Sequence, residues 1–266
     1  MNQEQHDLPS VTVDIVIFTI QNDDLCVLLI KRKYPPFQGK WAIPGGFVHS
    51  DETLANAAVR ELYEETGVQD VYIEQLYTFG DPKRDPRRRV ITVAYFALIS
   101  SENLLVRPDN DVSDVRWFSI YNLPKLAFDH GSILKYALKR LRNKIMYTNV
   151  AFQLLPEQFT LTELQKAYEV ILGKKLDKRN FRKKILSSNI LEKTHNKKVE
   201  GRHRPAMLYK FSATEDEDNE DMPEANFRRK VRLKQENPKN PIESGQPETQ
   251  AIIEPSLQLN SADNLT

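Results

Sequence analysis

"PGGFVHSDETLANAAVRELYEETGV", residues 44–68, gathers five carboxylates and one arginine into one turn-and-helix stretch. Apolar residues at helical spacing predict a helix from about 53 to 66, with Gly67 as its C-terminal stop. Glu61, Glu64 and Glu65 stand at i, i+3 and i+4, so they share one face of this helix. Clustered carboxylates repel one another, and the stretch therefore predicts a cation site or, alternatively, a solvated acidic face.

A divalent cation is the partner that this chemistry favours. Carboxylate oxygens suit Mg²⁺ or Mn²⁺, which would bridge to the phosphates of a ligand. Gly45 and Gly46 allow the backbone to turn tightly and to present a carbonyl oxygen to the same ion. If the helix instead carries only a solvated acidic face, Arg60 is a neighbouring ionic partner of its carboxylates.

The spacing of the stretch matches a known motif. Gly46, five residues, Glu52, seven residues and then the run 60–68 fit every fixed position of the Nudix box. Residues 8–145 thus resemble a Nudix domain, which implies an α/β/α sandwich that binds a nucleoside diphosphate linked to another moiety. The resemblance implies attack of a metal-activated water on a diphosphate. It assigns metal binding to Glu61, Glu64, Glu65 and the carbonyl of Gly45, and orientation of the catalytic helix to Arg60 and Glu52.

The segments around the box predict a mixed sheet with helices on its faces. Strand-like runs are "VTVDIVIFTI", "LCVLLIKRK", "YIEQLYTF", "RVITVAYFALI" and the short "VRWFSI". The turn signal "QNDD" separates the first two of these runs. A second amphipathic helix is expected from about 131 to 144. The fold class is therefore α/β.

Residues 75–98 bear on the ligand. Arg84, Arg87, Arg88 and Arg89 lie between two strands, where guanidinium groups suit phosphate recognition, although a solvated basic loop is the alternative. This segment and "LPKLAFDHGSIL", residues 123–134, resemble the Nudix branch that handles ADP-ribose. The nucleotide-binding residues that we predict are Arg84, Arg87, Arg89 and Phe79.

Two further roles stay open at this point. Tyr34, Trp41 and Phe79 are candidates for a face on which adenine stacks, but aromatic residues beside strands also belong to cores. The box leaves the water-activating base unassigned. Its candidates are Asp109, Asp111 and Asp114, which a polar loop would explain equally well.

A second, basic block follows at residues 146–212, with 14 Lys and Arg against 6 Asp and Glu. "FTLTELQKAYEVILG" begins with a capping box, Thr160 and Glu163, and ends at Gly173. "DKRNFRKKILSS" begins a second helix at Asp177, and "ILEKTHNKKV" and "AMLYKFS" read as a hairpin. Helix, turn, basic helix and hairpin predict a winged helix-turn-helix.

A basic helix face is often only a solvated surface, but this order of elements favours contact with double-stranded DNA. Lysine and arginine would neutralise phosphates, and residues near the start of the second helix would reach base edges. The DNA-binding residues that we predict are Lys178, Arg179, Asn180, Arg182, Lys183, Lys198 and Arg202.

A Nudix domain followed by a winged helix resembles the Nudix-related transcriptional regulators of NAD metabolism, the NrtR family. The resemblance covers about residues 8–212. It implies a homodimer, a repressor of NAD-related genes, whose affinity for a palindromic operator changes when ADP-ribose or a related nucleotide binds. The intact box supports a second hypothesis, an active Mg-dependent ADP-ribose pyrophosphatase whose basic domain has another role.

Composition adds limits to these hypotheses. The formal net charge is +1, the lone Cys26 excludes a disulfide framework, and no apolar run approaches the length of a membrane span. We therefore expect a cytoplasmic protein without membrane contact. Residues 213–266 open with the acidic run "EDEDNEDMPE" and have few aromatic residues, which predicts a disordered tail.

Overall fold

The computed structural model describes residues 8–67, 71–100, 112–199 and 205–212. The tail that we predicted to be disordered, residues 213–266, lies outside these ranges. Among the described residues no helix is long and apolar enough to cross a membrane.

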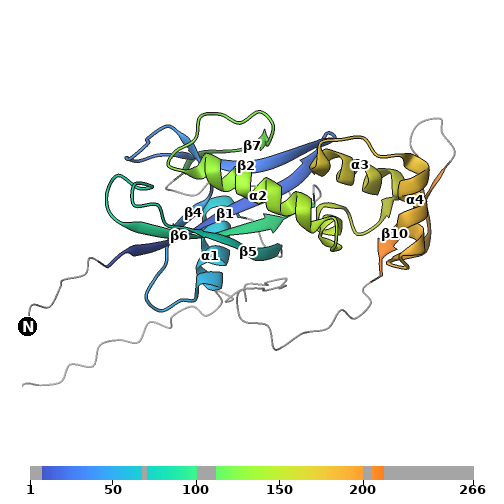
Figure 1. Ribbon diagram of the computed structural model, residues 1–266, viewed down its shortest axis with the longest axis horizontal. Helices are drawn as coiled ribbons and strands as arrows, with labels where there is room; N and C mark the ends of the chain where they lie inside the picture. The colour runs from blue at the N-terminus through green and yellow to red at the C-terminus, as the bar shows by residue number, and fades with distance from the viewer. Residues whose placement is uncertain (1–7, 68–70, 101–111, 200–204, 213–266) are drawn as a thin grey trace, which may run out of the picture. The chain divides into compact units, whose positions relative to one another are not determined.

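A seven-stranded sheet forms the centre of the N-terminal part (Figure 1). Its strands are β1 (Ser10–Gln21), β2 (Asp24–Arg32), β3 (Trp41–Ala42), β4 (Gly45–Phe47), β5 (Tyr72–Phe79), β6 (Val90–Leu98) and β7 (Val112–Ser119). The main order is β3-β2-β1-β6-β5, while β4 pairs with β1 and β7 pairs with β2. Strands β1 and β6 run parallel and the other pairs are antiparallel, so the predicted mixed sheet is confirmed.

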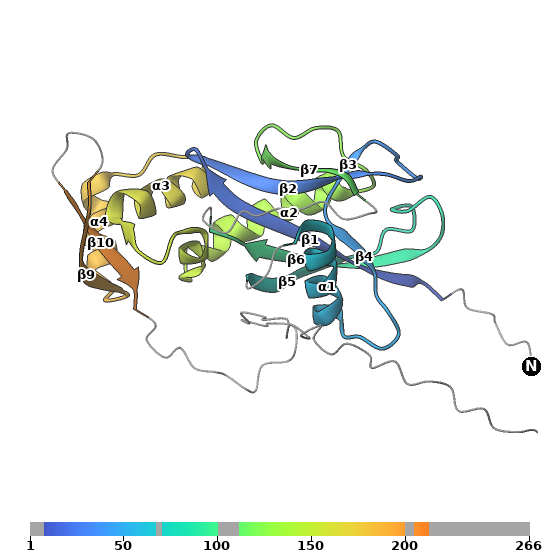
Figure 2. The same ribbon diagram turned by 180° about the vertical axis from the view of Figure 1, so that it is seen from behind.

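Two helices cover the two faces of this sheet. Figure 1 shows α2 (His130–Lys144) in front of the sheet, and Figure 2, turned by 180°, shows α1 (Leu54–Thr66) in front. Strand β1 alternates between the two layers because successive side chains of a strand point to opposite faces. Val13, Ile15 and Ile17 pack with α1, whereas Val16 and Phe18 pack with α2. The α/β/α sandwich that the Nudix resemblance implied is confirmed.

Both helices end much as their sequences predict. Thr53 caps α1 by accepting a hydrogen bond from the Asn56 amide, and Gly67 ends the helix in the left-handed conformation, with φ of 71°. Helix α2 begins at His130, one residue before the predicted start. The sequence missed the short strands β3 and β4, because two or three residues carry too little periodicity to be recognised.

The C-terminal part contains α3 (Leu161–Leu172), α4 (Lys178–Ser187), β8 (Phe159–Thr160), β9 (Leu191–Lys198) and β10 (Ala206–Phe211), after a 3-10 helix at Val150–Leu154. The strands form a second sheet in the order β8-β10-β9. The capping box of α3, the Asp177 cap of α4 and the hairpin are all confirmed. Phe152, Phe159 and Ile185 belong to a separate small core. This is the predicted winged helix.

The core on the α2 side does not stop at the end of α2. Ile145, Val150, Ala151 and Leu154 are buried in the same cluster, together with Ile171 from α3. The segment that joins the two parts is therefore packed against the first of them.

Candidate ligand site and DNA-binding surface

Arg60 organises the acidic helix. Its guanidinium donates to both carboxylate oxygens of Glu52, at 3.0 and 2.6 Å, and to the carbonyl of Phe47 at 3.1 Å. The same group donates to Glu61 at 2.8 Å and to Glu64 at 3.0 Å. Hydrogen bonds from Arg60 lower the pKa of Glu52 to about 2. Glu52 and Arg60 thus tie α1 to the loop before it, in keeping with the orienting role predicted for them.

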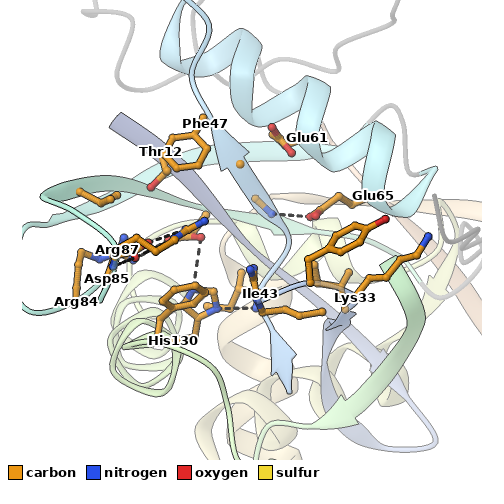
Figure 3. Close-up of a pocket in the computed structure, with 18 of the residues that line it drawn as sticks. Thr12, Lys33, Ile43, Phe47, Glu61, Glu65, Arg84, Asp85, Arg87 and His130 are labelled. Carbon is orange, nitrogen blue, oxygen red and sulfur yellow. Dashed lines mark hydrogen bonds and ion pairs between the residues drawn. The ribbon is translucent and has the colours of Figure 1, made fainter. Parts of the chain in front are cut away.

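Glu61 and Glu65 are the two carboxylates of the box that face a cavity of about 360 Å³ (Figure 3). Glu65 accepts a hydrogen bond of 2.6 Å from the amide of Gly45. Glu61 lies directly against Gly46, where a Cβ atom would be only 2.1 Å from its Oε1. Burial raises the pKa of Glu61, and it raises that of Glu65 well above the usual value. Withdrawal from water therefore disfavours the negative charge of both groups.

This donor set fits a divalent cation in part. Within the described ranges no three His, Cys, Asp or Glu side chains are gathered as a ready metal site. Two carboxylates converge, while the Glu64 side chain is 47% exposed and bonds to Arg60. Mg²⁺ is commonly held by one or two carboxylates together with the phosphates of a ligand, and such an ion would offset the cost of burying Glu61 and Glu65. The residues present are therefore compatible with a cation shared between protein and ligand.

The opposite wall of the cavity carries a buried charge network. Arg84, only 4% exposed, donates to Asp14 at 3.1 Å and to both oxygens of Asp129 at 2.9 and 3.1 Å. His130 accepts at Nδ1 from the amide of Ile43 at 2.8 Å, and its Nε2 lies 3.7 Å from Asp14. Burial lowers the pKa of His130. Arg84, which we predicted to bind phosphate, is thus held by two carboxylates. One of them lies on β1 and the other directly before α2, so the network joins these two elements.

Arg87 is the predicted arginine with the most access to the cavity. It pairs with the buried Asp85 at 2.7 Å, and its own side chain is 40% exposed. Its guanidinium lies 5.7 Å from the ring of Phe47 and 5.9 Å from that of Phe128. Arginine can bind phosphates and can also stack on flat ring systems, so Arg87 stays a candidate for ligand recognition.

Other predicted ligand residues lie elsewhere. Arg89 donates to the carbonyl of Gly80 at 2.7 Å, and Phe79 packs against Tyr77 and Tyr136; neither residue lines this cavity. Tyr34 does line it, whereas Trp41 packs edge-on against Phe118.

The candidate bases fall outside the cavity or outside the described residues. Asp114 lies on β7 and pairs with Arg116 at 2.7 Å, and it is not among the lining residues. Asp109 and Asp111 lie outside the described residues.

Several lining residues were not predicted from the sequence. They are Asp14, Arg32, Lys33, Asp85, Phe128 and His130. Phe128 and His130 belong to "LAFDH", which pointed to the ligand class but gave no role to single side chains. Asp14 lies in the middle of an apolar strand, and that isolated charge was the available signal.

The outer face of α4 is basic and open to solvent. Lys178, Arg179, Asn180 and Lys183 are exposed. Arg182 is half-buried and donates to Thr162 of α3 at 3.2 Å, so it joins the two helices. On the hairpin, Lys198 bonds to the capping-box residue Glu163 at 2.6 Å. Arg202 lies outside the described residues. Five of the predicted DNA-binding side chains thus lie on α4, and four of these five are exposed.

Comparison with known proteins agrees with this geometry. Residues 8–137 match the Nudix domain family, and residues 151–211 match the NrtR DNA-binding winged helix domain. Fold and site therefore define a Nudix domain joined to a DNA-binding winged helix domain.

Full-length relatives specify the class further. The ADPR responsive transcriptional repressor of Acinetobacter baylyi is 42% identical over 208 residues, which cover 77% of this chain and 82% of that protein. The crystal structure of Shewanella oneidensis NrtR with a 27mer DNA is 41% identical, with a TM-score of 0.68, over 76% of this chain and 93% of that chain. The chain belongs to the NrtR family, as its sequence predicted.

The Nudix domain by itself is also similar to a protein that carries the name of an enzyme. The ADP-ribose pyrophosphatase of Methanocaldococcus jannaschii is 42% identical over 127 residues, which cover 48% of this chain and 72% of that protein.

Proposed function

We propose that this protein is an ADP-ribose responsive transcriptional repressor of NAD-related genes. Its Nudix cavity takes ADP-ribose or a related nucleotide diphosphate, and its winged helix binds double-stranded DNA. The observation that carries the proposal is the presence, in one chain, of a cavity lined by carboxylates and arginines and of an exposed basic helix. The names of the relatives from Acinetobacter baylyi and Shewanella oneidensis support the same assignment.

The cavity supports a diphosphate ligand by its size and its charges. Its volume of about 360 Å³ lies within the usual range for small-molecule pockets. Glu61 and Glu65 would hold Mg²⁺ or Mn²⁺, which supplies positive charge to the diphosphate when bound. Arg87 would meet the phosphates from the other wall, and Phe47 and Phe128 beside it offer apolar faces to a ribose or a base.

The α4 surface supports DNA binding because some of its side chains are placed for base edges and others for phosphates. Lys178, Arg179, Asn180 and Lys183 lie from the first to the second turn of the helix, where a recognition helix reaches the base edges of a major groove. Arg182, Lys198 and Arg202 would contact the phosphate backbone, which fixes orientation without reading sequence. A homodimer would present two such helices to the half-sites of a palindrome. Light scattering would show a mass of twice the 30.9 kDa chain.

A second function, ADP-ribose pyrophosphatase activity, is favoured by the geometry of the box. Glu52 and Arg60 hold α1 so that Glu61 and Glu65 face the cavity. A divalent cation held by these two carboxylates would supply positive charge where the diphosphate develops negative charge. The name of the Methanocaldococcus jannaschii relative is consistent with this activity.

One experiment separates the two functions. The protein is incubated with ADP-ribose and Mg²⁺, and AMP release and binding of a palindromic duplex from its own gene neighbourhood are measured on the same sample. The regulator binds that duplex more tightly than random DNA at physiological salt, and ADP-ribose weakens the binding. AMP release without any sequence-specific binding would instead leave the pyrophosphatase function alone.

A further inference from the structure

Helix α2 connects the ligand cavity with the winged helix domain. At its first residues, Asp129 binds Arg84 and His130 accepts from the Ile43 amide, and both Arg84 and His130 line the cavity. Its 15 residues extend about 22 Å, at about 1.5 Å per residue. The far end of α2 lies against the last turn of α3, the first full helix of the winged domain.

Two side chains of the Nudix part bind the end of α3. The hydroxyl of Tyr121 donates to the carbonyl of Val170 at 2.6 Å, and Nε of Arg142 on α2 donates to the carbonyl of Ile171 at 2.8 Å. The two side chains also touch one another, with Arg142 Nη2 3.3 Å from the Tyr121 hydroxyl. We call this pair the Tyr121–Arg142 clamp.

The clamp supplies partners that α3 itself lacks. The last four carbonyls of an α-helix have no intrahelical donor. In α3, which ends at Leu172, the Glu169 carbonyl accepts from the amides of Gly173 and Lys174. The next two carbonyls are those bound by the clamp. The Nudix part therefore completes the C-terminal cap of a helix in the DNA-binding domain.

A well-packed helix, α2, lies between the clamp and the cavity. Ile133, Leu134, Ala137 and Leu141 bury one side of α2 in the core, so the helix moves as one piece when it moves. Small shifts of a helix at an interface, of about 1–2 Å, are a known means by which binding signals travel. A ligand that contacts Arg84 or His130 would act on the end of α2 opposite the clamp.

We propose that Tyr121 and Arg142 are the positioning residues through which occupancy of the cavity controls the DNA-binding helices. The inference rests on the proposed function, since it concerns how ADP-ribose alters operator affinity. Neither residue lines the cavity, and neither lies on α4, so both act only through the elements that they hold.

The test measures coupling rather than affinity. Operator affinity is determined by fluorescence anisotropy with and without saturating ADP-ribose, for the full chain and for Tyr121→Phe and Arg142→Ala. In the wild type we expect the ratio of the two dissociation constants to lie in the range typical of allostery, roughly 5–150-fold. In both variants the ratio falls toward one, while ADP-ribose affinity without DNA stays at the wild-type value. Tyr121→Phe removes a single oxygen and keeps the ring, so folding is preserved.

Lys166→Ala provides the matched control. Lys166 also lies on α3 and also reaches the Nudix part, where it forms an exposed ion pair of 2.8 Å with the side chain of Asp23. Exposed ion pairs of this kind contribute little, so this variant keeps wild-type coupling. Wild-type coupling in both Tyr121→Phe and Arg142→Ala overturns the inference, and so does an equal loss in Lys166→Ala. If the proposed function itself is wrong, the result differs. ADP-ribose then leaves the operator affinity of the wild type unchanged, and the variants have no coupling to lose.

Discussion

The carboxylates on the cavity side of α1 and the cations on the outer face of α4 are both groups of like charge, but the first are largely buried and the second are exposed to water. In the cavity, Glu61 and Glu65 are buried, and their pKa values are raised for that reason. On α4, Lys178, Arg179 and Lys183 are exposed. A buried site depends on the position of single atoms, whereas an exposed surface depends mainly on how many charges it carries. Substitutions should therefore have steep effects in the first region and graded effects in the second.

The steepest effect is expected at Gly45, which lines the cavity. A Cβ atom there would lie 2.1 Å from the carbonyl oxygen of Val13, and the residue has φ of 153°. Since the obstacle is backbone, it cannot swing aside, and Gly45→Ala should lower the free energy of unfolding by about 3 kcal/mol or more. Urea unfolding measures this change.

Gly131→Ala is the control for that substitution. Gly131 lies in the first turn of α2 with nothing within 4 Å of its added Cβ. Alanine favours the helix there, so stability should stay constant or rise by up to about 1 kcal/mol. Equal effects of the two substitutions would show that the packing around Gly45 is looser than described.

A somewhat smaller effect separates two neighbouring carboxylates of the box. Glu65→Gln keeps an oxygen for the Gly45 amide but removes a charge that faces the cavity. Mn²⁺ affinity in the presence of ADP-ribose should fall on the order of a hundredfold, about 2.7 kcal/mol. Glu64→Gln should cost less than about tenfold, because the Glu64 side chain is 47% exposed. Calorimetric titration of Mn²⁺ compares the two variants. Equal losses of affinity would contradict the assignment of Glu61 and Glu65 as the carboxylates that hold the cation.

On α4 the effects should be graded. Arg179→Ala and Lys183→Ala should each cost roughly 1–3 kcal/mol of operator binding if the side chain reads a base edge. Loss of a phosphate contact would instead weaken binding to all sequences and reduce the salt slope by about one. Anisotropy at several salt concentrations distinguishes these results. ADP-ribose affinity should not change, and a change in it would show that α4 contributes to the cavity.

The smallest effect concerns acid stability. Because Arg60 lowers the pKa of Glu52 from 4.5 to about 2, the folded protein binds this proton less readily than the unfolded chain. The ionised pair therefore stabilises the fold above pH 4.5, and this contribution is lost as the pH falls toward about 2. Thermal unfolding of Glu52→Gln should start lower at neutral pH and decline less across that window. Parallel curves for variant and wild type would exclude the contribution.

The two regions also differ in what their sequences reveal. The box residues lie on one helix and its preceding loop, so fixed spacing alone predicts that Glu52, Arg60, Glu61, Glu64 and Glu65 act together. The spacing does not reveal that Glu64 bonds to Arg60 and does not line the cavity. The basic face of α4 is equally local. In both cases one element carries the whole pattern, and helical periodicity is enough to find it.

The other wall of the cavity could not be predicted in this way. Asp14, Arg84 and His130 come from three segments that meet only when β1, the loop before β6 and the start of α2 fold together. Arg84 and Arg89 look alike in sequence, yet one is buried between two carboxylates and the other bonds to a loop carbonyl. Only tertiary contacts distinguish them.

If the buried cavity and the exposed helix α4 are coupled, ADP-ribose and DNA must affect each other's binding. Two sites that are coupled must influence each other's affinity by the same factor. ADP-ribose binding to the full chain is measured by calorimetry, alone and with a saturating palindromic operator. We expect the operator to weaken ADP-ribose binding by the same factor by which ADP-ribose weakens operator binding. Equal ADP-ribose affinity in both samples, with the operator bound, would contradict this coupling.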